Sequence, residues 1–356
     1  MTSRTAGALA LALLCVGATG CRTVAYLARG GFAEARVLWR REPIDAVLAR
    51  PDVTPERRER LRLVLEVRRF AADVLGLRVG ESFATFAEVE GDAIVWVVSA
   101  ARRDRLEAYT WWYPIVGSVP YQGYFERPDA DAAARALAAK GFDVDVRPAA
   151  AFSTLGWFAD PLLSTTADAD PVRLAETVLH ELFHATLYVP GATEFNESAA
   201  TFVGYRGAIA YFCDVAPADL QRCERARAGW RELQAHARVL GRYMGRLRAL
   251  YARPTARLEV RRTRLAEAAA ASLVRRRLGG ASELVPPNNA RLLAMTVYET
   301  DLGTFDRLAP GSAALPGAIA RIVAVARGAD EPFEAIRGLV PDALQTTRAR
   351  LDSPPS

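Results

Sequence analysis

Two of the three histidines in this 356-residue chain lie four positions apart, in the run His180-Glu181-Leu182-Phe183-His184. Residues four apart on a helix share one face, so both imidazoles can reach the same metal ion. Glu181 is rotated to the side of that pair, where its carboxylate can accept a proton from an attacking water. This H-E-x-x-H pattern predicts hydrolysis assisted by Zn²⁺, with His180 and His184 as metal ligands and Glu181 as general base. The alternative is a helix whose two histidines bind nothing.

The residues around the motif predict the helix that it needs. Asp170 is a good N-cap, Pro171 suits the first helical position, and Pro190-Gly191 would end the helix. Apolar residues at helical spacing supply a face to bury: Leu174, Val178, Leu179 and Leu182. The motif is therefore expected near the end of an amphipathic helix.

A catalytic zinc takes three protein ligands and keeps one position open, so the motif requires a third ligand. A second predicted helix starts near Thr193, tied by the tight Pro-Gly turn to the end of the first. Glu197, 13 residues after His184, is our candidate for that ligand. Glu194 is the runner-up and is expected at the turn, facing solvent. Glu197 could alternatively be an acidic residue that the helix dipole favours at a helix start.

The N-terminus predicts export. A short positive stretch is followed by an apolar run from Ala6 to about Val16, which is too short to span a membrane and is typical of a signal peptide over residues 1–20. Small residues lead directly into Cys21, as in the lipobox of bacterial lipoproteins, although Ala18 stands where leucine is usual. We expect a lipid on Cys21, or otherwise an ordinary signal peptide cut nearby. The expected location is the cell envelope, with a lipid anchor in the membrane and the protein on the periplasmic side of the outer membrane.

Two cysteines remain in the exported chain, Cys213 and Cys223, on either side of a predicted helix–helix corner. In an oxidising compartment they could form a disulfide. Two unpaired buried thiols are the alternative.

The charge is moderately basic, with a formal net charge of +5 and a pI of about 9.2. Almost all the positive charge is arginine, spread among acidic residues along predicted helices. No nucleic-acid recognition motif accompanies it. We therefore expect solvated helix faces and no nucleic-acid partner.

The predicted organisation is α+β. Residues 21–50 are expected to be a helical tether, residues 51–169 an α+β part, and residues 170–350 a predominantly helical metal-binding part. Within the α+β part the pattern predicts helices over 54–77 and 130–140, and strands near 93–98, 109–125 and 143–146. We expect a small, mostly antiparallel sheet packed against the helical part, with a cleft between them.

The motifs together resemble the bacterial predicted aminopeptidase family. The resemblance is carried by residues 180–188 and 195–203. It extends to Gly20-Cys21 and to residues 113–114, 119–125, 151–158, 160–162 and 288–292, so it covers nearly the whole chain. It implies a zincin-like helical part with a gluzincin-like site, in which two histidines and one glutamate hold Zn²⁺. It also implies peptides as substrates and, frequently, a lipoprotein.

Substrate-binding residues are less well defined. The resemblance suggests that residues 151–158 form an edge strand that pairs with the substrate backbone through Ser153, Thr154, Leu155 and Gly156; a buried strand or turn is the equal alternative. Several side chains could donate a hydrogen bond to a tetrahedral oxyanion, and the sequence does not choose among them: Tyr113, Tyr121, Tyr124, Tyr205 and His236. For His236 we expect a solvent-facing structural role. Glu194 or Asp160 could bind a substrate ammonium.

Two other functions fit the same residues. One is a zinc hydrolase that acts on another amide or on an ester. The other is a catalytically idle, metal-bearing envelope lipoprotein that binds a partner. Glu181 argues against the second, because a purely structural metal site has no use for that carboxylate.

Overall fold

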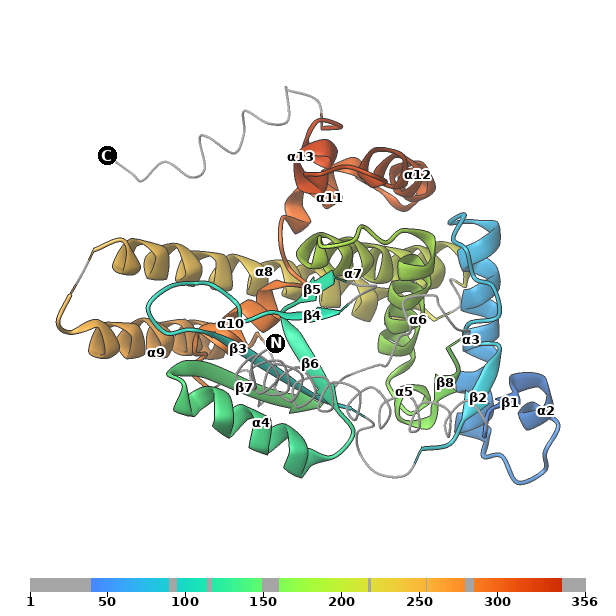
Figure 1. Cartoon of the computed structure of the whole chain (residues 1–356). Helices are drawn as coiled ribbons and strands as arrows, with labels where there is room; N and C mark the ends of the chain where they lie inside the picture. Colours follow the sequence, from blue (N-terminus) through green and yellow to red (C-terminus); the bar gives the residue numbers. More distant parts are fainter. Residues whose placement is uncertain are drawn as a thin grey trace, which may run out of the picture.

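The computed structural model describes residues 40–89, 95–113, 117–148, 160–216, 219–253, 255–278 and 285–340 (Figure 1). A group of packed helices occupies one side of the molecule, a small sheet with one covering helix lies beside it, and a long helical hairpin runs from the helices alongside the sheet. The predicted α+β class is confirmed.

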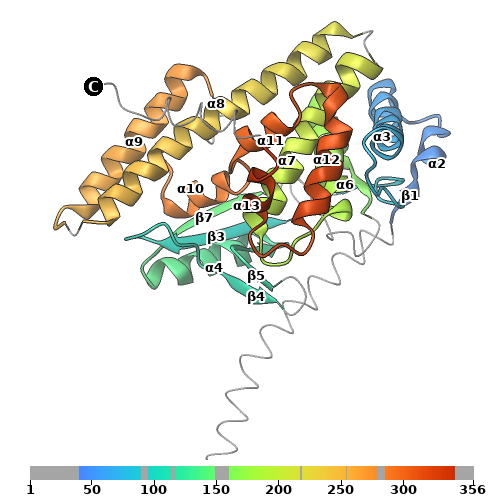
Figure 2. The same ribbon diagram turned by 90° about the horizontal axis from the view of Figure 1, so that it is seen from above.

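Three helices form the centre of the main core. Helix α3 (Pro55–Asp73) begins at Thr54, whose hydroxyl accepts a hydrogen bond from the Arg57 N–H. It packs on α6 (Pro171–Thr186), which in turn packs along α7 (Thr193–Ala210). Helices α11 (Leu302–Leu308), α12 (Leu315–Ala326) and α13 (Pro332–Arg337) lie over α7 (Figure 2). Four fully buried phenylalanines fill the contact: Phe183, Phe195, Phe202 and Phe305.

The larger of the sheets has the strand order β6-β3-β7, and both pairings are antiparallel. These strands are β3 (Trp96–Arg102), β6 (Tyr121–Tyr124) and β7 (Phe142–Pro148). Alternate residues point to opposite faces. One face packs its apolar residues, Val98 and Ala100 among them, against α4 (Arg127–Ala139). The other face carries Ser99, Tyr121 and Asp145 side by side, in register, and is polar.

Helix α10 (Asn289–Thr296) fixes the polar face of the sheet beside the helices. The Asn288 side chain caps α10 and also donates to the Val144 carbonyl. The buried Asn289 side chain donates to the Arg102 carbonyl, and its backbone N–H donates to Asp143. Two adjacent asparagines thus join β3, β7 and α10.

Smaller strands complete the β-structure. A hairpin is formed by β4 (Trp111–Tyr113) and β5 (Gly117–Val119). A second sheet orders β1 (Glu42–Pro43), β2 (Thr85–Ala87) and β8 (Leu162–Leu163), and its β2–β8 pair is parallel. Helix α5 (Ser164–Ala167) leads from β8 toward α6.

Residues 42–48, at the end of the expected tether, pack against the main core. Strand β1 pairs with β2, and the next helix, α2 (Ile44–Leu48), buries Ile44 and Val47 in the main core. These two apolar side chains are buried because they pack beside α3. Cys21 and residues 151–158 lie outside the described residues.

The long hairpin consists of α8 (Leu220–Tyr251) and α9 (Leu258–Arg276). Helix α7 continues into a π-helical turn (Tyr211–Val215), and Cys213 in that turn forms a disulfide with Cys223 in α8. In the described part of the chain no single helix is long and apolar enough to span a membrane. Residues 302–308 and 312–326 pass that test only as a pair, with a bend of 89° between them.

Candidate metal centre

Helix α6 begins as the sequence predicts and places both motif histidines in its last two turns. The Asp170 carboxylate accepts a hydrogen bond from the Val172 N–H at 2.9 Å, and Pro171 is the first helical residue. The rings of His180 and His184 meet edge to face, with centroids 4.8 Å apart. Both Nε2 atoms therefore face one point on the side of α6 that is turned toward α7.

A short connection brings α7 back along α6. The Asn196 side chain accepts from the Val189 N–H and donates to the Val189 carbonyl, so one amide closes the loop from both sides. Gly191 adopts a positive φ of 79°, which glycine tolerates without strain. Because this loop is fixed, the first turns of α7 lie directly opposite the motif.

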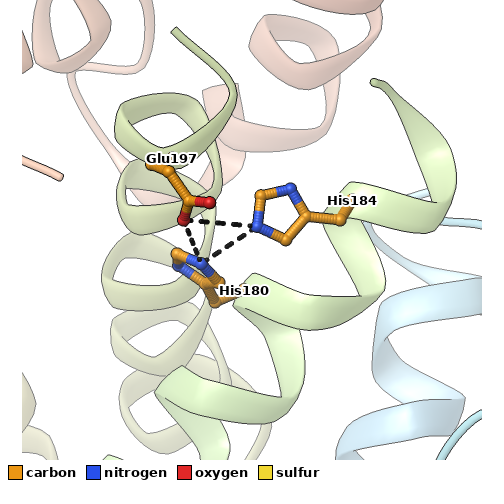
Figure 3. Close-up of side chains that lie close together, drawn as sticks. All are labelled: His180, His184 and Glu197. Atoms are coloured by element: carbon orange, nitrogen blue, oxygen red, sulfur yellow. Dashed lines mark hydrogen bonds and ion pairs between the residues drawn. The ribbon is translucent and has the colours of Figure 1, made fainter. Parts of the chain in front are cut away.

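Glu197 comes from that part of α7, and its carboxylate meets both histidines (Figure 3). Glu197 Oε2 lies 3.3 Å from His180 Nε2 and 3.5 Å from His184 Nε2, and the two nitrogens are 3.1 Å apart. The side chains of His184 and Glu197 are buried, and that of His180 is 16% exposed. Glu194, the runner-up for this position, is exposed at the start of the helix.

The size of this triangle fits a metal ion. Ligand atoms about 2.0–2.1 Å from a tetrahedral Zn²⁺ are separated by about 3.3–3.4 Å, close to all three observed distances. Protons alone cannot satisfy the triangle. A hydrogen bond between the two Nε2 atoms requires one nitrogen to donate its N–H and the other to accept through its lone pair. The accepting nitrogen carries no proton, so it cannot also donate to Glu197. A cation at the centre attracts all three atoms, so the donor set suits a metal.

The charges in the site keep Glu197 in the form that binds metals, whereas they favour a proton on His184 that a bound metal would have to displace. Burial by itself would raise the pKa of Glu197, but the two imidazoles outweigh it and hold that pKa well below its usual range. Burial likewise opposes protonation of His184, yet Glu197 outweighs it and raises the pKa of His184. Glu197 is therefore an anion at neutral pH, as a metal ligand must be.

Tyrosines from three elements surround this centre. Tyr298, after α10, places its ring 6.1 Å from that of His180, and its pKa is raised well above its ordinary value, first by Glu197 and then by burial. Burial raises the pKa of Tyr121, with Glu197 and Glu181 adding to the effect. Burial and Glu197 also raise the pKa of Tyr188. All three hydroxyls thus remain protonated hydrogen-bond donors, and each lies close enough to Glu197 to feel its charge.

Ser198 positions Tyr298. This fully buried serine, the residue after Glu197, donates to the Val297 carbonyl at 3.0 Å and accepts from the Thr300 N–H at 2.9 Å. The hydroxyl therefore bonds the chain on both sides of Tyr298. The sequence offered no signal for this pairing, because about a hundred residues separate the two segments.

The other predicted oxyanion donors lie elsewhere or have other partners. The Gln122 amide donates to Tyr113 and accepts from Tyr124, whose ring packs in the cluster under α4. Tyr205 lies two turns along α7 from Glu197, and its hydroxyl accepts from Arg173 at 2.7 Å. Of the tyrosines considered from the sequence, Tyr121 is the one whose pKa responds to Glu197 and Glu181.

The expectation that His236 faces solvent is wrong. Its side chain is buried and its Nδ1 lies 2.8 Å from Glu299, the residue after Tyr298. The turn of α8 that carries His236 packs inward, which places it among core residues. Asp160 is also buried, whereas Glu194 is exposed. Ser153, Thr154, Leu155 and Gly156 lie outside the described residues.

The chain matches the family model described as "Putative aminopeptidase" over residues 25–316. It belongs to this family, since the match covers most of its length and includes the H-E-x-x-H helix, Glu197 and Tyr298. No curated protein and no solved structure matches the chain.

Proposed function

We propose that this protein is a zinc-dependent metallopeptidase, acting as an aminopeptidase, with a gluzincin-like site formed by His180, His184 and Glu197. The observation that carries the proposal is the triangle of two imidazole nitrogens and one carboxylate oxygen, with edges of 3.1–3.5 Å. Membership of an aminopeptidase family supports a peptide as substrate. The H-E-x-x-H pattern supports hydrolysis rather than a structural metal site.

A bound Zn²⁺ would supply Lewis-acid chemistry, polarising the scissile carbonyl and making water nucleophilic near neutral pH. The chain's own residues supply the rest. Glu181 follows His180 on α6 and is partly exposed, so it can take a proton from the attacking water and pass it to the leaving amine. Glu197 is ionised, and a bound metal would take the Nε2 lone pairs of His180 and His184 in place of protons.

Tyr298 and Tyr121 are the candidates to donate a hydrogen bond to the oxygen that gains charge during attack. We assign this role to Tyr298, because its ring lies against His180 and Ser198 holds the backbone on both sides of it. A donor fixed in place before the reaction stabilises developing charge without reorganisation.

The proposed location is the cell envelope, with the mature chain attached through a lipid on Cys21. The support is the short apolar N-terminal run and the small residues before Cys21. An acyl anchor needs two or more chains for stable attachment, which a lipoprotein-type modification supplies.

The test compares peptide cleavage by wild type, Glu181→Gln and the matched control Glu194→Gln, each with measured zinc content. Quenched peptides with free and blocked N-termini report amide hydrolysis and aminopeptidase preference, and ester substrates are run in parallel. We expect Glu181→Gln to keep zinc and lose turnover, and Glu194→Gln to retain both. Cleavage of esters but not peptides by the zinc-loaded wild type would instead support a different hydrolase. Absence of any hydrolysis would support an idle metal-bearing protein.

A further inference from the structure

The α8–α9 hairpin carries a large part of the positive charge of the chain. Residues 220–277 contain 16 arginines and four acidic residues, a formal net charge of +12, although the whole chain carries only +5. The rest of the sequence therefore has a net charge of −7. Figure 2 shows the hairpin extending along one side of the molecule, with α9 lying beside the outer part of α8.

Few of these arginines have a protein partner. Three of them form ion pairs with acidic residues in other elements: Arg222 with Glu59, Arg225 with Asp170 and Arg262 with Asp143. The other 13 are exposed and form no ion pair within the described ranges: Arg227, Arg231, Arg238, Arg242, Arg246, Arg248, Arg253, Arg257, Arg261, Arg264, Arg275, Arg276 and Arg277. Folding therefore leaves a dense array of unneutralised guanidinium groups on one projecting element.

Their spacing arranges them in rows. On α8, Arg227 is followed by arginines at intervals of 4, 7, 4 and 4 residues, ending at Arg246. At 100° per residue these five lie within an arc of about 100°, along about 28 Å of helix. A second row follows Arg257, the N-cap of α9, and includes Arg261 and Arg264. Each row faces away from the buried stripe of its own helix.

We propose that the α8–α9 hairpin is a docking surface for a membrane rich in anionic phospholipid, whose phosphates its exposed arginines bind. A guanidinium group matches phosphate oxygens with paired N–H donors, and like-charged neighbours repel one another until an anionic surface neutralises them. This electrostatic attraction acts within about one Debye length, which is about 8 Å at physiological salt. It therefore favours a membrane surface, where many phosphates lie within that distance of the arginines, over a dilute small anion.

Two features favour lipid over nucleic acid. Val260 and Val274 on α9 are each 52% exposed among the arginines, and apolar side chains of this kind can enter the boundary between headgroups and acyl chains. The aromatic residues of the hairpin, Trp230, Tyr243 and Tyr251, are buried or partly buried, so the described part of the hairpin lacks the exposed rings on which single-stranded bases stack.

The test uses the full-length chain carrying Cys21→Ser, so that no lipid is attached, and measures its sedimentation with vesicles. One set contains phosphatidylcholine alone and the other contains 30% phosphatidylglycerol. The hairpin variant changes Arg231, Arg238 and Arg242 to glutamine. The control variant changes three exposed arginines on α3 and α4 to glutamine: Arg62, Arg69 and Arg135. Its net charge therefore falls by the same amount as that of the hairpin variant. Circular dichroism and zinc content check that both variants fold.

We expect wild type and control to prefer phosphatidylglycerol vesicles, and 1 M NaCl to abolish that preference. Each arginine near an anionic surface contributes about a fivefold gain in binding, so the hairpin variant should bind about a hundredfold more weakly. The N-terminal segment is common to all three chains and cannot produce this difference. Equal binding by variant and wild type overturns the proposal, as does an equal loss in the control. Tighter binding to duplex DNA than to vesicles, through the same three arginines, would overturn it in favour of nucleic acid.

Discussion

Gly204 of α7 lies directly against the backbone of Glu176 in α6. A Cβ atom at position 204 would come within 2.6 Å of the Glu176 carbonyl oxygen and 3.3 Å of His180 Cβ. Such a distance is not tolerated by real Cβ atoms, and the obstacle is helix backbone, which cannot move aside as a side chain can. The spacing of α6 and α7, and with it the distance from Glu197 to the histidines, therefore depends on glycine at this position.

Gly204→Ala should push the two helices apart, lowering both zinc affinity and stability. We expect a loss of about 1–3 kcal/mol, as for other overpacked core sites. The control is Gly241→Ala on α8, where the new Cβ meets nothing within 4 Å and should stabilise the helix slightly. Thermal unfolding and competitive zinc titration measure the two effects. Unchanged zinc affinity in a destabilised Gly204→Ala would show that the helix spacing does not control the site.

Glu197→Ala should weaken zinc binding by at least about a hundredfold, because a directly bound ligand contributes more than the 10–100-fold typical of outer-shell residues. Glu194→Ala should bind zinc as the wild type does, since that side chain is exposed at the start of the same helix. Titration against a chelator of known affinity distinguishes the two variants. The reverse result would assign the third ligand to Glu194.

Tyr298→Phe should lower kcat by about a hundredfold, as removal of an oxyanion donor does elsewhere, with little change in KM or in zinc content. Tyr113→Phe is the matched control, because its hydroxyl accepts from Gln122. Ser198→Ala, which releases the backbone around Tyr298, should reproduce part of the loss. If Tyr121→Phe lowers kcat and Tyr298→Phe does not, the donor is Tyr121.

Glu176 makes stability depend on pH. Burial raises the pKa of Glu176 to about 7, although Arg173, bonded at 3.1 Å, opposes the shift. The folded state therefore holds this proton more tightly than the unfolded state does. The stability that the folded protein gains from protonated Glu176 is fully present below the unfolded pKa of about 4.5 and is lost as pH rises toward 7.

Relative to wild type, Glu176→Gln should therefore gain stability between pH 5 and pH 8, by up to about 3 kcal/mol at about 1.4 kcal/mol per pKa unit. Urea unfolding of both metal-free proteins at each pH gives the difference in stability. A difference in stability that does not change with pH would show that Glu176 is ionised throughout.

Local patterns predicted most elements and the core of the site. The cap at Asp170, the four-residue histidine spacing and the tight turn before α7 are properties of neighbouring residues, so the sequence alone indicated them. Tyr298 could not be predicted, because its place beside His180 depends on Ser198 bonding a segment about a hundred residues away. The burial of His236 could not be predicted for a related reason. An arginine-rich helix predicts exposure on average, whereas burial at one turn depends on what packs there.

If His180, His184 and Glu197 hold one zinc ion, elemental analysis of the purified full-length chain will detect it. The protein is expressed without added metal, dialysed against metal-free buffer and measured for zinc, iron, manganese and nickel. His180→Ala and His184→Ala are treated in the same way. We expect about one zinc per wild-type chain and less than about a tenth of that in either variant, since two remaining ligands hold zinc poorly. A wild-type chain without stoichiometric metal, or variants that retain it, would show that these three residues do not form a zinc site.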